Sequence, residues 1–191
     1  MTRHLGLFAA ALSAACTATH DSESKPFAVS GFGGVLLDNN YEDVFVPGRL
    51  QFESSYLFGL AGSARIARPF DGLDIELEAQ LVRHAHAQTH WELNAPIVTA
   101  RWTAFPWDDY VDTSAAFGLG LSVTSETPQL EVRNEGESQP LMAYWMFELA
   151  FDLPPDDWEL IARLHHRSTA YGTFGDNGGA NGLVLGLRHR F

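Results

Sequence analysis

His166 and Ser168 are the residues of this chain whose types and spacing could catalyse acyl transfer. They lie two positions apart in the stretch LHHRSTAYG, residues 164–172. An imidazole within hydrogen-bonding reach of a serine hydroxyl can take its proton, which makes the oxygen a nucleophile toward an ester carbonyl. Both side chains must then point the same way, so the chemistry depends on the element that carries them.

Residues 157–168 read as a β-strand, because apolar and polar side chains alternate along them. Successive side chains of a strand point to opposite faces. His166 and Ser168 therefore fall on the face of Trp158 and Leu160, while His165 and Arg167 fall on the polar face.

The same alternation recurs through the chain, and no amphipathic helix is expected. In residues 73–81 a row of leucine, isoleucine and alanine faces away from Asp74, Glu76 and Glu78. Eight strands are predicted, at residues 27–38, 51–67, 72–84, 90–105, 110–124, 141–153, 157–168 and 181–191. Most are long enough to cross a bilayer as tilted strands, for which about 9–11 residues suffice.

The connections between these strands favour one fold class. Tight turns (RPFDG, PWDD and PPDD) alternate with longer polar segments at residues 39–50, 85–89, 125–140 and 169–180. That alternation is typical of an outer-membrane barrel with periplasmic turns and extracellular loops. A soluble lipocalin-like barrel or a sandwich would also alternate. It would have no reason to gather the larger apolar residues on one face and the charges on the other, where the charges neutralise one another in a narrow lumen.

The sequence thus predicts an all-β chain that forms an eight-stranded antiparallel transmembrane β-barrel of the outer membrane, preceded by a signal peptide. Residues 1–20 have a short basic start, an apolar run and small residues, as in a cleaved signal peptide. Residues 21–191 would form the single barrel domain. Cys16, the one cysteine, is expected to leave with the signal peptide; lipidation of this residue is the alternative.

Composition narrows the possible partners. The formal net charge of -12 excludes the positive footprint that nucleic-acid binding requires. No apolar run of about 18 residues follows the N-terminus, so no transmembrane helix is indicated.

Barrel topology sets the height of the candidate pair. With both termini in the periplasm, strand 157–168 runs outward, and His166 and Ser168 lie near the boundary between lipid headgroups and acyl chains. Asn181 heads the lipid-facing row of the next strand and could hold the imidazole in one tautomer, although it lacks the charge of a carboxylate. The alternative is that the histidine and serine only form part of an interfacial girdle.

The C-terminal segment HHRSTAYGTFGDNGGANGLVLGLRHRF resembles the signature of the outer-membrane lipid A 3-O-deacylase (acyloxyacyl hydrolase-like) family. The resemblance implies an eight-stranded barrel that removes an ester-linked acyl chain from lipid A, without a cofactor. It makes His166 the base and Ser168 the nucleophile. It is specific over roughly the last 27 residues.

Two positions depart from the family pattern. Thr169 follows the serine where the family has an asparagine that supports the oxyanion. The family's glutamate has no Glu counterpart; when one inserted residue is allowed, Asn181 falls at its place. Asn177 falls near the family's loop asparagine. Backbone N–H groups of the loop GDNGGAN could replace the missing donor; the alternative is a degenerate site and another role for the barrel.

Two other polar clusters are given structural interpretations. His84, His86 and His90 lack a diagnostic metal-ligand spacing, so a polar strand end is preferred to a metal site. Residues 131–140 (EVRNEGESQP) are expected to form a mobile, solvated acidic loop.

The favoured function is an outer-membrane serine esterase acting on lipid A or a related lipid of lipopolysaccharide in the outer leaflet, with no metal and no cofactor. The alternative is a non-catalytic small barrel with a structural or adhesion role.

Overall fold

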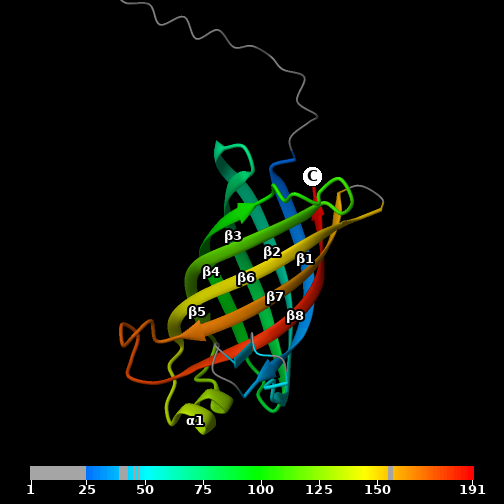
Figure 1. Cartoon of the computed structure of the whole chain (residues 1–191). Helices are drawn as coiled ribbons and strands as arrows, with labels where there is room; N and C mark the ends of the chain where they lie inside the picture. Colours follow the sequence, from blue (N-terminus) through cyan, green and yellow to red (C-terminus); the bar gives the residue numbers. More distant parts are fainter. Residues whose placement is uncertain (1–24, 39–42, 45, 47, 155–156) are drawn as a thin grey trace, which may run out of the picture.

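The computed structural model describes residues 25–38, 43–44, 46, 48–154 and 157–191. Eight antiparallel strands pair in sequence order, and β1 pairs with β8 to close the barrel (Figure 1). The strands are β1 (Phe27–Leu37), β2 (Phe52–Phe70), β3 (Leu73–His86), β4 (Trp91–Trp102), β5 (Thr113–Thr124), β6 (Leu141–Leu153), β7 (Trp158–Ser168) and β8 (Gly179–Arg190). The fold class predicted from the alternation is confirmed, and most strand bounds differ from the expected ones by three residues or fewer.

The two faces of the strands separate as the alternation requires. In β3, Leu77 and Leu81 are 43% and 50% exposed, whereas Glu76 and Glu78 are buried. The outer wall consists largely of exposed apolar side chains, among them Phe58, Leu60, Ile66, Leu119 and Leu185. Such a belt is stable only against lipid, because soluble proteins rarely expose contiguous apolar patches of this extent.

The lumen is filled by paired charges, as the sequence predicted. Glu148 accepts hydrogen bonds from Arg101 and Arg163 at 2.8 Å each. Glu76 binds Arg101 and Arg188, and Glu78 binds Arg163 at 3.0 Å. Each of these carboxylates has a guanidinium partner, which offsets part of the large desolvation cost of burying it.

Both ends of the described chain lie at the same end of the barrel, where Phe27 and Phe191 exchange backbone hydrogen bonds of 3.2 and 2.9 Å. The opposite end carries α1 (Gln129–Glu135) (Figure 1). If the termini face the periplasm, as expected from the sequence, α1 and the end of β7 are on the extracellular side. Within the described residues, no helix is long and apolar enough to cross a membrane.

The segment between β3 and β4, residues 87–90, is about as long as the predicted segment 85–89 and is only shifted, because β3 continues to His86. One predicted connection is wrong in length. The segment between β4 and β5 is longer than a tight turn: Asp108 accepts backbone N–H groups from Phe105 and Thr113, at 2.6 and 3.2 Å, and so folds it into a compact loop.

The expectation that no helix forms is also wrong, and so is the expectation that residues 131–140 are solvated throughout. Helix α1 begins within the extracellular segment 125–140 and ends at Gly136, whose φ of 89° suits a helix C-cap. Its Leu130 packs in the lumen with Leu36, Leu57 and Val82. The predicted signal peptide, residues 1–20 with Cys16, lies outside the described residues.

Candidate active site on the outer wall

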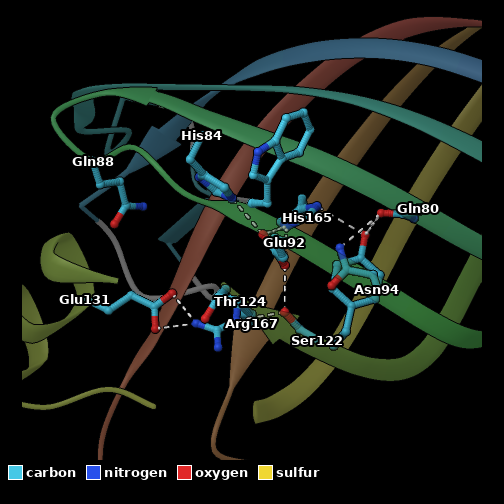
Figure 2. Close-up of polar contacts among 12 residues, drawn as sticks. Gln80, His84, Gln88, Glu92, Asn94, Ser122, Thr124, Glu131, His165 and Arg167 are labelled. Atoms are coloured by element: carbon cyan, nitrogen blue, oxygen red, sulfur yellow. Dashed lines mark hydrogen bonds and ion pairs between the residues drawn. The ribbon is translucent and has the colours of Figure 1, made fainter. Parts of the chain in front are cut away.

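Near its extracellular end, strand β7 points one pair of polar side chains into the lumen and another pair out of the barrel. His165 and Arg167 point inward, where they join hydrogen bonds with Glu92 and Glu131 (Figure 2). His166 and Ser168 therefore face outward, on the same side as the exposed Trp158 and Leu160. The orientation expected from the alternation agrees with this arrangement.

His166 is held by residues of both neighbouring strands. Its Nδ1 lies 2.6 Å from Oδ1 of Asn181, its partner across the β7–β8 pair. On the other side the Trp145 ring of β6 lies over it, with ring centroids 4.4 Å apart. As a result His166 is only 7% exposed, so it is recessed in the wall rather than open to lipid as the sequence suggested.

The contact with Asn181 fixes the chemistry of the imidazole. An amide oxygen only accepts hydrogen bonds, so Nδ1 of His166 must carry the hydrogen. In that tautomer Nε2 is the atom with a lone pair. The arrangement is the one a general base requires, with an amide in place of the usual carboxylate.

Ser168 lies on the same face, about 7 Å further along β7 by the rise of a strand. It is half-buried and pairs with Ala143 on β6 and Gly179 on β8. Within the described residues, no hydrogen bond joins its hydroxyl to the His166 ring. The structure thus brings His166 and Asn181 into contact and leaves Ser168 beside them.

A cleft of about 330 Å³ opens over these three residues. Its lining also includes Leu37, Gly178 and Gly179 and, from the lumen side, Leu130, Glu131 and Arg167. Its position at the rim of the barrel lets it meet both the membrane surface and the extracellular side.

A second, apolar cavity of about 530 Å³ lies on the same wall, beside the residues that follow His166 and Asn181 toward the membrane centre. Small residues (Gly33, Gly34 and Ala162) leave room for it, and Leu164 and Leu183 lie in the outward rows that continue to His166 and Asn181. Its remaining outward-facing lining is Val35, Val44, Phe147, Leu149 and Leu185. A lipid chain could lie in this cavity with its polar end at the cleft.

The two predicted supporting residues lie in the loop after β7. Thr169 directly follows the strand, and its carbonyl accepts the N–H of Phe174 at 2.9 Å. The N–H of Asn177 donates to Oε1 of Glu137 at 2.8 Å. The Asn177 N–H is therefore already engaged, and Gly178 and Gly179 are the loop residues that border the cleft.

The histidines of the β3–β4 connection take structural positions. His84 donates to Glu92 at 2.7 Å and stacks on His90, while Nδ1 of His86 lies 2.6 Å from the Ser54 carbonyl. Among the described residues, no three His, Cys, Asp or Glu side chains are grouped to hold a metal ion. Burial, and then the adjacent His84, lower the pKa of His90 to about 4.

Sequence reasoning missed the interior network behind the candidate site. Glu92 accepts hydrogen bonds from His84, Ser122 and His165, and Arg167 joins it through Ser122 (Figure 2). The alternation placed these side chains in the lumen, but their partners depend on the register between strands that are distant in sequence.

Comparison with known proteins supports the fold. No protein-family model and no curated protein matches the chain. Among solved structures, the outer membrane enzyme PagL is similar with a TM-score of 0.58 and 14% identity, over 86% of this chain and 99% of that one. Neisserial surface protein A (NspA) is similar with a TM-score of 0.51 and 11% identity, over 88% of this chain and 98% of that one. The chain is therefore an eight-stranded barrel of the outer-membrane type, located in the outer membrane.

Proposed function

We propose that this barrel is a serine esterase that removes an ester-linked acyl chain from lipid A or a related outer-leaflet lipid. The observation that carries the proposal is the 2.6 Å contact between His166 Nδ1 and Asn181 Oδ1 on the membrane-facing wall, with Ser168 on the same face. A histidine and a serine that only belonged to an interfacial girdle would not need a buried imidazole held in one orientation, whereas acyl transfer does.

The reaction needs no cofactor. Ser168 Oγ attacks the ester carbonyl while His166 Nε2 takes its proton, and the same proton then passes to the departing alcohol. Water, activated by His166, hydrolyses the acyl-serine and restores the hydroxyl. Backbone N–H groups at Gly178 and Gly179 are the donors we assign to the oxyanion.

The surroundings suit a lipid substrate. The apolar cavity beside the site would receive the acyl chain, and the cleft at the rim would receive the polar headgroup. The C-terminal resemblance to lipid A 3-O-deacylases and the likeness in fold to an outer membrane enzyme favour lipid A as the substrate.

Mass spectrometry of lipid A from cells that produce the barrel tests this function. Wild type should yield lipid A lacking one acyl chain, and Ser168→Ala and His166→Ala should not. Ser114→Ala is the matched control, because Ser114 is also a strand serine but lies buried in the lumen, where it accepts a hydrogen bond from Arg101. Identical spectra for wild type and Ser168→Ala, with both inserted, would refute the esterase.

One observation favours a second candidate function. Asn181 supplies no negative charge to stabilise an imidazolium, and Thr169 replaces the family's asparagine. These two differences are compatible with a barrel that retains the arrangement of His166, Ser168 and Asn181 without esterase activity and serves a structural or adhesion role. It would give unchanged lipid spectra in the experiment above.

A further inference from the structure

We propose that Arg167 and Glu131 are positioning residues for the His166–Ser168 pair, through which helix α1 braces the active strand from inside the barrel. The inference rests on the proposed function. It concerns two side chains that line the lumen side of the same cleft and whose polar atoms bind other groups of the protein.

Arg167 occupies the position between His166 and Ser168 on β7. Its side chain is buried in the lumen and donates through all three nitrogens (Figure 2). Nε binds Ser122 Oγ at 2.8 Å, and NH1 binds both carboxylate oxygens of Glu131 at 2.7 and 2.8 Å. NH2 binds the carbonyls of Gln139 and Pro140 at 2.7 and 3.0 Å. The backbone that displays the catalytic pair is thus tied to β5, to α1 and to the start of β6.

Glu131 belongs to the first turn of α1 yet is buried at 3% exposure. Ser138 Oγ donates to its second oxygen at 2.5 Å. A buried carboxylate with a guanidinium and a hydroxyl as partners sets the position of the helix firmly, because either charge alone would be strongly unfavourable there.

The segment after α1 also packs on the loop that links β7 to β8. Glu137 accepts the N–H of Asn177 at 2.8 Å. Gly178 lies so close that a Cβ on it would be 3.0 Å from the Glu137 carbonyl, and a Cβ on Gly175 would overlap the Gln139 amide. Both glycines have φ near +115°, a conformation that other residues rarely adopt. Residues 131–140 therefore contact the end of β7 just before Ser168, and they also contact the loop that follows Ser168.

These contacts determine how Ser168 and Asn181 lie relative to His166. β7 and β8 pair at His166–Asn181 and at Ser168–Gly179. Residues 131–140 connect the end of β7 to the loop before β8, through Glu131 to Arg167 and through Glu137 to Asn177. A shift of about 1 Å at a reacting group reduces rates strongly even when the change lies elsewhere. Loss of the brace should lower turnover more than substrate binding.

The test compares Glu131→Gln with Glu148→Gln. Glu148 is also a buried carboxylate with guanidinium partners, Arg101 and Arg163, but it lies further down the lumen. We expect Glu131→Gln to lower kcat at least tenfold with KM within twofold, and Glu148→Gln to leave both within twofold. Arg167→Lys, which keeps the charge and loses the forked contacts, should lower kcat similarly and serves if Glu131→Gln does not fold. The double variant should be no slower than the slower single one, because both changes break the same contact.

Amide hydrogen exchange gives a readout that does not need activity. In Glu131→Gln, amides of residues 164–170 and 179–182 should exchange at least tenfold faster than in wild type while those of β2 and β3 change little; in Glu148→Gln, any increase should be shared by both sets of amides. Equal exchange and equal kcat in the two glutamate variants would overturn the positioning role. An inactive wild type with the expected exchange difference would instead refute the esterase and leave the brace standing.

Discussion

The contact between His166 and Asn181 gives the sharpest quantitative prediction. Both side chains are buried, at 7% and 6% exposure, and Nδ1 and Oδ1 are 2.6 Å apart. Asn181→Ala would leave a buried N–H without its acceptor, at about 1–3 kcal/mol. If that loss falls on the transition state, kcat decreases by about 5- to 150-fold.

The opposite change should increase the rate. In Asn181→Asp a carboxylate would accept the same hydrogen, and hydrogen bonds to charged groups exceed neutral ones by about 1 kcal/mol. That difference corresponds to roughly a fivefold higher kcat. The family resemblance places an acidic residue at this position, so the substitution also restores the pattern from which the chain departs.

Purified barrels in detergent, given a chromogenic fatty-acyl ester, allow both variants to be assayed. Asn94→Ala is the matched control, because Asn94 is a fully buried asparagine in the lumen that donates to Gln80. Electrophoresis of unheated samples would establish that every variant is folded. If Asn181→Ala retains kcat within twofold of wild type, Asn181 does not orient the base.

Three further changes test other parts of the account. Ala162→Leu fills the apolar cavity, so this variant should cleave esters of long acyl chains about tenfold more slowly than wild type and short esters at nearly the wild-type rate. Competition kinetics would measure both rates. An equal loss of rate for both chain lengths would contradict a cavity that binds the acyl chain. Glu148→Gln leaves Arg101 and Arg163 without a shared carboxylate, so urea unfolding should show a loss of about 3–5 kcal/mol, and a loss below 1 kcal/mol would mean that the lumen pairs contribute little. Because the pKa of His90 is held at about 4, the unfolded chain binds one more proton than the folded barrel between that pH and about pH 6.5. The contribution of His90 to stability is therefore complete above this window and decreases as the pH falls through it. His90→Gln should flatten the stability curve between these pH values, and an unchanged slope would contradict the pKa shift.

The alternation of side chains was sufficient to predict the barrel and the faces of its strands. In β3 and β7 most residue types identify their face, because lipid and a charged lumen select opposite polarities; Val82 and Ile161 in the lumen and His166 and Ser168 on the outer face are exceptions. The same parity placed His166 and Asn181 on one face, and neighbouring strands of an up-and-down barrel pair directly. Their juxtaposition was therefore predictable from sequence, although the 2.6 Å contact required the register.

The parts that were missed depend on partners far apart in the chain. Glu131 reads as one acidic residue in a polar loop, and only the register of β7 shows that Arg167 lies beneath it. Trp145 reads as a lipid-facing aromatic, yet its ring covers His166 because β6 and β7 pair at these residues. Long-range pairing of this kind leaves no local periodicity for sequence reasoning to detect.

Covalent labelling of Ser168 would show whether this hydroxyl is an activated nucleophile. The purified barrel would be treated with a fluorophosphonate that carries an alkyl chain, and its peptides would be analysed by mass spectrometry. The account predicts one adduct on Ser168, absent in His166→Ala and slower in Glu131→Gln. A folded wild-type barrel whose Ser168 stays unmodified, or is modified equally in His166→Ala, would contradict it.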